Sequence, residues 1–184
     1  MHFKLGLYEH QSAGAIQAMT DLLANAPELM DNGGEKIKTI TITAYEPAFG
    51  IIGDPAKRKP TTRQSADHSM VYIIATLIRK AIENKANGLE TKWEELILLP
   101  EDYSADAINN GTTRAIMDKI QFAHGGDEYD SKYPDGIPTS VIIEDTAGGT
   151  ADSGLVLYPA GHARNATHDL AALLANKWTK LGAL

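Results

Sequence analysis

The chain has 184 residues, 43% of them hydrophobic, which is enough for one domain with a hydrophobic core. Its formal net charge of -7, from 17 basic and 24 acidic residues, argues against a nucleic-acid-binding protein, because such proteins need a basic surface. The absence of cysteine excludes disulfides, thiolate zinc sites and cysteine-ligated iron–sulfur clusters. No apolar run approaches membrane-spanning length, so we expect a soluble, intracellular protein without membrane contact.

The first predicted element is a helix that begins near Ser12 and ends before Pro27. Ser12 is a candidate N-cap, and the helix is indicated by apolar residues at three- and four-residue spacing, namely Ala15, Ile16, Met19, Leu22 and Leu23. Four polar residues precede it: Lys4, Glu9, His10 and Gln11. Side chains before a helix can converge on an anion, although Lys4 taken alone is better interpreted as an ordinary surface lysine.

A strand is predicted over residues 36–44, because isoleucine and alanine alternate there with threonine. Such alternation is typical of a sheet with one buried face. Residues 45–60 are expected to be irregular, since they contain three prolines. The basic run over residues 57–59 is interpreted as a solvated loop, with an anionic ligand as the alternative.

The longest predicted helix lies within residues 61–84 and ends near Asn87 and Gly88. Its wide apolar face indicates a buried helix, formed by Met70, Val71, Ile73, Ile74, Leu77, Ile78, Ala81 and Ile82. Ser65 or Asp67 is the expected N-cap, and the first turn carries the polar residues Arg63, Asp67, His68 and Ser69. A histidine at a helix N-terminus suits proton transfer or ligand binding. Alternatively, Asp67 and His68 only cap the helix.

After the long helix we expect short helical pieces over residues 93–110 and a helix over residues 112–122, capped by Thr112 or Thr113. A hairpin follows, with one strand over residues 139–146 and a second strand ending at residues 155–158. The last expected element is a helix that starts at Thr167 or Asp169. The histidine and acidic residues 124–128 match no metal-ligand spacing. The loop that contains Gly161, His162 and Arg164 is a candidate anion pocket. Together the elements predict an α+β fold, with helices layered on a small, mainly antiparallel sheet.

Three segments resemble the C-terminal domain of the MmgE/PrpD family: FKLGLYEHQSAGAIQAM at residues 3–19, ADHSMVY at residues 66–72 and YPAGHARN at residues 158–165. With YEPAFGIIGDP at residues 45–55 between them, the resemblance covers essentially the whole chain. It implies that residues 1–184 form a single domain, the second of two, and that a helical N-terminal domain lies outside this chain. The apolar start, with Phe3, Leu5 and Leu7, is expected to be exposed for contact with that domain.

The family includes 2-methylcitrate dehydratase, which acts in the methylcitrate cycle of propionate catabolism. The resemblance therefore implies a homodimeric hydro-lyase for a small tricarboxylate, which uses no metal and no cofactor and works in the cytoplasm, or in the mitochondrial matrix of a eukaryote. By position it assigns Lys4 and His68 as candidate catalytic residues. Substrate binding is expected from Lys4, His10, Arg63, His68, His162 and Arg164. For His162 and Arg164, a structural role is an equal alternative.

The residue types fit this chemistry in part. Dehydration of a citrate-like hydroxy acid requires a base for the proton next to a carboxylate, an acid for the leaving hydroxyl, and cations that hold the carboxylates. The sequence offers cations and a histidine but no complete acid–base set, which agrees with half of an active site. The alternatives are a non-catalytic binding or dimerisation module of the same fold, or another dehydratase, decarboxylase or epimerase of the family.

Overall fold

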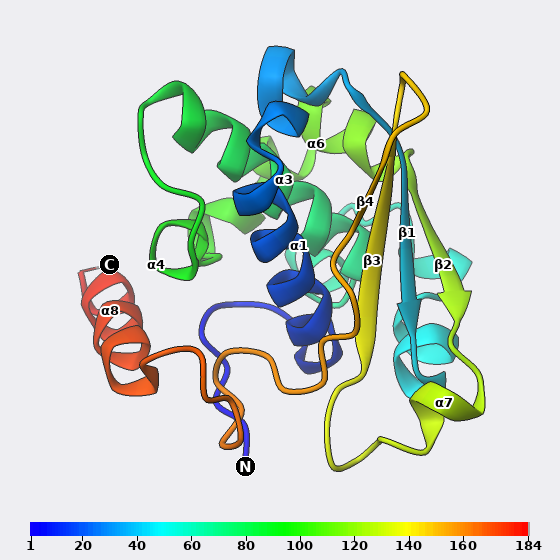
Figure 1. Ribbon diagram of the computed structural model, residues 1–184. Coiled ribbons are helices and arrows are strands. Elements are labelled where there is room, and N and C mark those ends of the chain that lie inside the picture. Colours follow the sequence, from blue (N-terminus) through cyan, green and yellow to red (C-terminus); the bar gives the residue numbers. More distant parts are fainter. Residues whose placement is uncertain (184) are drawn as a thin grey trace.

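Four strands form a mixed sheet in the order β2-β1-β3-β4, seen edge-on in the computed structural model, which describes residues 1–183 (Figure 1). The strands are β1 (Ile37–Ala44), β2 (Ile120–His124), β3 (Thr139–Asp145) and β4 (Thr150–Asp152). β1 pairs with β2 in parallel and with β3 in antiparallel orientation, and β3 pairs with β4 in antiparallel orientation. The predicted α+β fold with a mainly antiparallel sheet is therefore confirmed, with one parallel pair added.

The helices are α1 (Ala13–Asn25), α2 (Arg63–Asp67), α3 (Met70–Ala86), α4 (Trp93–Leu96), α5 (Ala105–Ile108), α6 (Gly111–Met117), α7 (Asp127–Asp130) and α8 (Leu170–Gly182). Shorter helical turns occupy His10–Ser12, Pro27–Gly34, Pro47–Ile52, Pro55–Lys57 and Pro100–Tyr103. Helices α1 and α3 pack against each other on one side of the sheet (Figure 1). No helix within residues 1–183 is both long and apolar enough to cross a membrane.

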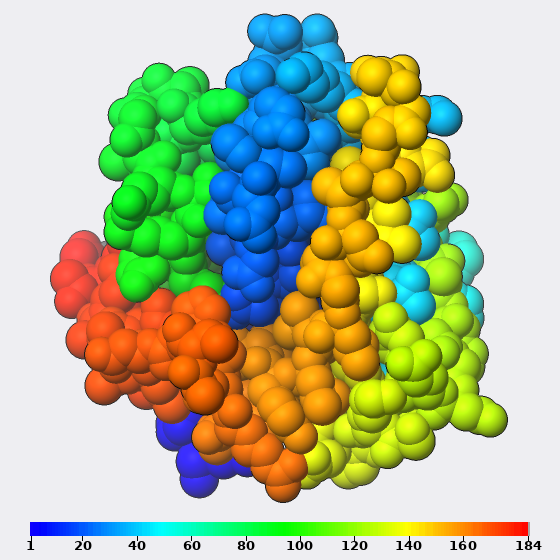
Figure 2. Space-filling model, viewed as in Figure 1, coloured from blue at the N-terminus to red at the C-terminus, as the bar shows by residue number. Residues whose placement is uncertain are grey.

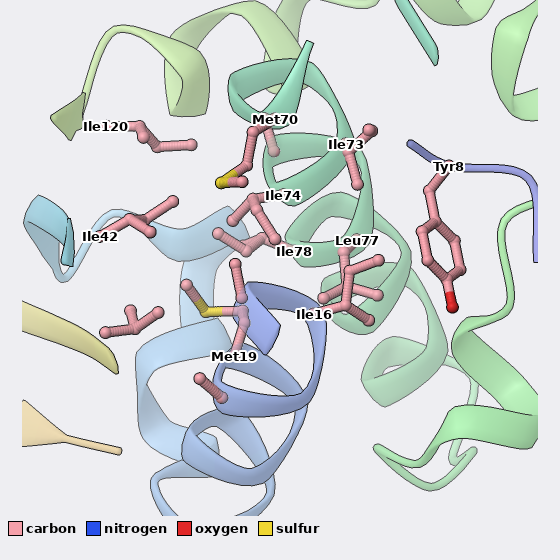
Figure 3. Packing of buried hydrophobic residues seen from close by; sticks show 14 of the residues in the cluster. Tyr8, Ile16, Met19, Ile42, Met70, Ile73, Ile74, Leu77, Ile78 and Ile120 are labelled. Atoms are coloured by element: carbon pink, nitrogen blue, oxygen red, sulfur yellow. The ribbon is translucent and has the colours of Figure 1, made fainter. Parts of the chain in front are cut away.

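The hydrophobic core lies between α1, α3 and the sheet, where Ile16, Met19, Ile42, Ile74 and Ile120 meet (Figure 3). The predicted apolar face of the long helix is confirmed, because all of its residues are buried except Ile82, which is half-buried. Burying an aliphatic side chain of this size contributes about 1.5–3 kcal/mol. This core supplies the rigid base on which the polar N-terminal residues rest.

The start of the long helix differs from the prediction. Neither Ser65 nor Asp67 caps it: α3 begins at Met70, and the Ser69 hydroxyl accepts a hydrogen bond from the Tyr72 N–H at 3.2 Å. Residues 63–67 form the separate short helix α2, whose N-cap is Thr62. The interpretation of Asp67 and His68 as caps of the long helix is therefore wrong, because Ser69 already holds that position.

The predicted helix over residues 112–122 is wrong in its second half. α6 ends at Met117, and after Asp118 and Lys119 the residues Ile120–His124 form β2, in which Ile120 pairs with Ile40. The cap is Asn110, whose side chain accepts a hydrogen bond from the Thr113 N–H at 3.0 Å. Thr112 and Thr113 do not cap the helix. The second predicted hairpin strand is shorter than expected, since β4 ends at Asp152 and Val156 makes only an isolated bridge to Thr139.

Two further expectations concern the ends of the described chain. The final helix is confirmed as α8, capped by the Asp169 carboxylate, although Trp178 is 65% exposed. The apolar start is only partly exposed: Phe3 is 40% exposed, while Leu5 is buried in the core and Leu7 is half-buried. The expectation that all three residues are exposed is wrong, because the folded chain itself covers Leu5.

Candidate active-site pocket

Residues 2–9, here called the N-terminal strap, form no helix and are fixed by backbone hydrogen bonds to three distant segments. The Phe3 N–H donates to the Gly161 carbonyl at 2.8 Å, and the Leu7 N–H donates to the Leu98 carbonyl at 3.0 Å. The Glu9 N–H donates to the Asp67 carbonyl at 3.0 Å, which joins the strap to the end of α2. In Figure 2 the dark-blue start of the chain lies next to the orange segment near residue 160. The strap thus has a defined position relative to α2.

A pocket of about 340 Å³ lies between the strap, the helical turn His10–Ser12 and α2. Lys4, His10, Arg63 and His68 all line it, together with the carboxylate residues Glu9 and Asp67. The prediction that Lys4, Arg63 and His68 share one concave surface is confirmed. Their roles in binding or catalysis stay predictions.

Two cations in this pocket are available for a ligand. Lys4 and Arg63 are exposed, and neither side chain forms an ion pair or a hydrogen bond with any residue from 1 to 183. The Lys4 ammonium lies 5.7 Å from the centroid of the Tyr8 ring, an attractive cation–π distance. Because no carboxylate of the described chain neutralises these two cations, an anion that enters the pocket can pair with both.

His68 lies between two helices, directly after α2 and two residues before α3 begins. Its Nδ1 contacts the Asp67 carboxylate and lies 3.2 Å from the Gln64 carbonyl. Both partners of Nδ1 are hydrogen-bond acceptors, so Nδ1 carries the proton in this arrangement and Nε2 is the nitrogen left for a substrate. His68 therefore does not lie in the first turn of a helix, contrary to the prediction. Its ring is oriented instead by the neighbouring Asp67 carboxylate.

Glu9 is a pocket residue that the sequence placed in the polar cluster before the first helix but to which it assigned no binding or catalytic role. Only 7% of its surface is exposed, and burial raises the pKa of its carboxyl group. Hydrogen bonds from the Ser12 hydroxyl to Oε1, at 2.8 Å, and from the Gln11 N–H to Oε2, at 3.1 Å, oppose that rise in pKa. The prediction that the Ser12 side chain caps α1 is therefore wrong, because its hydroxyl binds Glu9 instead. The only sequence signal for Glu9 is a carboxylate just before a helix, which also fits a simple cap.

Three histidines that are scattered in the sequence meet at the edge of the pocket, where His10 is the member that lines it. The His2 ring centroid lies 4.6 Å from that of His10 and 5.6 Å from that of His162. Burial, followed by the charges of His10 and His162, lowers the pKa of His2 to about 4. Burial and the nearby Lys4 ammonium also lower the pKa of His10. His10 thus favours the neutral form in which it can accept a proton.

In the part of the chain that the structure describes, no three histidine, aspartate or glutamate side chains are grouped so that they could hold a metal ion. The expectation of a metal-independent site comes from the sequence and stays a prediction.

His162 and Arg164 do not line this pocket. His162 is 9% exposed, and its Nδ1 accepts a hydrogen bond from the Arg164 N–H at 3.1 Å. The Arg164 guanidinium pairs with the Asp135 carboxylate and donates to the Tyr158 hydroxyl at 3.0 Å. The fold does not bring these two predicted substrate-binding residues to the pocket lined by Lys4 and Arg63. Their contacts favour the structural alternative.

No family model and no curated protein matches this chain. The resemblance to the MmgE/PrpD family therefore rests on its three sequence segments.

Proposed function

We propose that this chain is the second domain of a MmgE/PrpD-family hydro-lyase that dehydrates 2-methylcitrate to 2-methylaconitate. The observation that supports this best is the convergence of Lys4, His10, Arg63 and His68 on one pocket. These residues come from two distant segments, and the resemblance had singled out all four before any spatial relation was known. A chance arrangement would not be expected to collect four of them at one place.

The charges of the pocket support a polycarboxylate substrate. Lys4 and Arg63 would hold two carboxylates of the substrate, since both cations lack partners within residues 1–183. A volume of about 340 Å³ fits a ligand of this size, because small-molecule sites start at roughly 300 Å³. In this assignment the cations also stabilise the negative charge that develops when the proton next to a carboxylate is removed.

His68 is the proposed proton-transfer group. Asp67 and the Gln64 carbonyl both face Nδ1, which leaves Nε2 to accept the carbon-bound proton or to protonate the leaving hydroxyl. A second proton-transfer group is needed for the other half of the reaction, and the proposal places it on the helical partner domain. Glu9 is committed to Ser12 and Gln11 through both of its carboxylate oxygens, so we assign it to fixing the strap.

A partner domain is part of the proposal for a physical reason. Lys4, His10 and Arg63 are all exposed, so water has access to the pocket. Excluding water strengthens the electrostatic interactions on which an enediolate depends. We therefore propose that a helical domain covers the pocket in a homodimeric enzyme located in the cytoplasm, or in the mitochondrial matrix of a eukaryote.

The test is to assay dehydration of 2-methylcitrate by the purified 184-residue chain alone and in the presence of the helical domain. We expect no turnover above background from the chain alone and clear turnover once both domains are joined, because fixing both halves of a site contributes several kcal/mol. Citrate and other small hydroxy acids serve as a substrate panel. Turnover by the chain alone would refute the division of the site, and no turnover of any panel member by the joined domains would favour a binding module.

A further inference from the structure

A second pocket with a basic wall lies between residues 58–59 and α6. Its volume is about 240 Å³, and it is lined by Arg58, Lys59, Arg114, Met117 and Asp118. Three cations thus face one carboxylate, although the whole chain has a formal net charge of -7. None of the three cations forms an ion pair with another residue in the described range 1–183. We propose that this pocket binds a phosphate group.

The two guanidinium groups are held in place by the backbone. Arg58 donates from Nη1 to the Ile120 carbonyl at 2.9 Å, and its guanidinium carbon lies 5.4 Å from the centroid of the Phe122 ring. Arg114 donates from Nε to the Ile108 carbonyl at 2.7 Å and from Nη2 to the Pro60 carbonyl at 2.7 Å. A guanidinium has five N–H donors, so both groups keep donors for a ligand while their positions are fixed. Both guanidinium groups are therefore already ordered before a ligand binds, so binding does not bear the entropic cost of ordering them.

The size and the charge of the pocket determine the class of ligand. About 240 Å³ is below the usual range for drug-sized ligands, so the pocket takes a phosphate group and leaves the rest of a larger molecule outside. Arginine forks match phosphate oxygens in pairs, and Lys59 adds a flexible third cation. Free inorganic phosphate and a phosphorylated metabolite share this chemistry. Asp118 reduces the net positive charge, so we expect modest affinity.

The same segment also reaches the first pocket. Arg114 holds the Pro60 carbonyl just before α2, and the Ser69 hydroxyl donates to the Lys57 carbonyl at 2.6 Å. A phosphate bound at Arg58 and Lys59 would therefore restrict the segment that leads into α2 and Arg63. The phosphate proposal does not depend on the lyase activity, because it rests only on the second pocket.

The test is calorimetric titration of the full 184-residue chain with inorganic phosphate at low salt, repeated for Lys59→Glu and for Arg63→Ala. Lys59 is exposed and has no hydrogen-bond partner for its side chain within the described residues, so its charge reversal should not disturb folding. We expect saturable binding that Lys59→Glu weakens by about tenfold or more, as two units of charge at contact distance require. Arg63→Ala, in the first pocket, should leave the affinity for phosphate at Arg58, Lys59 and Arg114 unchanged. Adenosine monophosphate in place of phosphate shows whether a phosphorylated metabolite binds more tightly than the free ion.

A second measurement locates the ligand. In the amide spectrum of the isotope-labelled chain, phosphate should shift the signals of Lys59, Arg114 and Asp118 and leave those of Lys4 and His10 in place. No saturable binding would overturn the proposal. So would binding that is lost with Arg63→Ala and kept with Lys59→Glu, because the ion would then occupy the first pocket.

Discussion

The two groups of predicted substrate-binding residues differ in what their charged atoms contact. Lys4 and Arg63 face a common pocket, and no carboxylate in the described chain pairs with them. Arg164, in contrast, is paired with Asp135 and with the Tyr158 hydroxyl. Both regions carry cations next to a helix or a glycine-containing loop, so their sequences look alike. From this comparison we infer that the cations without a partner in the described chain are the ones available to a ligand.

The largest expected effect tests the open pocket. In the proposed two-domain enzyme, Lys4→Ala or His68→Ala should lower kcat/KM by roughly 10- to 1,000-fold, because each removes one of the proposed substrate-binding or proton-transfer groups. The measurement is steady-state dehydration of 2-methylcitrate. His68→Ala should mainly lower kcat, since a proton-transfer group acts in the transition state.

The matched control is Lys38→Ala, which removes an exposed lysine of β1 that forms a surface ion pair of 3.8 Å with Glu144. Its kinetics should equal those of the unchanged enzyme. If both pocket variants keep near-normal kinetics, the pocket has no catalytic role and the binding-module alternative stands.

The next effect tests whether residues 158–165 act by fixing the N-terminal strap. Gly161 has a φ of 91°, and a β-carbon there would lie 2.3 Å from the Phe3 carbonyl oxygen. Gly161→Ala should therefore destabilise the fold by about 2–3 kcal/mol, the sum of left-handed backbone strain and displacement of the strap. Denaturant unfolding measures this change.

Gly154→Ala provides the control for backbone strain, because Gly154 also has a positive φ, 64°, but nothing lies within 4 Å of the added carbon. Gly154→Ala should lower the free energy of unfolding by only about 1 kcal/mol. Equal losses for the two variants would mean that contact with the strap contributes nothing.

The sequence predicted those helices and strands whose structure follows from a single local pattern. The apolar spacing of α3 and the alternation in β1 each have a single interpretation, and both elements are present. β2 could not be predicted, because its five residues continue the apolar spacing of α6 and its parallel partner β1 lies far away in the sequence. Tertiary pairing decided the structure of that segment.

The candidate site was also predictable only where a local sequence pattern pointed to it. Lys4, Arg63 and His68 each precede an apolar helix, and this shared position indicated a common surface. The pairing of Arg164 with Asp135 was not visible, since no local pattern connects two residues on different loops. The interpretation of Arg164 as a substrate ligand came from its glycine-containing loop and from the family resemblance, and its pairing with Asp135 favours the structural alternative.

A smaller effect tests the histidine cluster that joins the two regions. The pKa of His2 falls from 6.5 to about 4 in the folded chain. The unfolded chain therefore binds more protons between these two pH values, so stability should decrease as the pH falls from 6.5 towards 4 and should not change through His2 above pH 6.5. After allowance for solvent screening, we expect His2 to lower the free energy of unfolding by about 1–2 kcal/mol near pH 4 relative to neutral pH.

Urea unfolding of the unchanged chain and of His2→Gln at pH 7.5 and near pH 4.5 checks this expectation. The variant should lose less stability over the interval, and the remaining decrease should come in part from His10 and His162, whose pKa values burial also lowers. The raised pKa of Glu9 acts in the opposite direction in acid, and it is common to both chains. The same pH dependence in both chains would show that the His2 ring does not need to stay neutral.

The smallest effect is expected at Arg164, and it tests the comparison most directly. Because Asp135 and Tyr158 already occupy its guanidinium on the surface, Arg164→Ala should keep kcat/KM within about threefold of the unchanged enzyme, whereas Arg63→Ala should lose at least tenfold. Asp135→Asn is the matched variant, since it removes the carboxylate and keeps the arginine. If Arg164→Ala impaired turnover as much as Arg63→Ala and Asp135→Asn lowered KM, Arg164 would have to leave Asp135 for the substrate. Internal pairing would then no longer separate structural cations from binding cations in this protein.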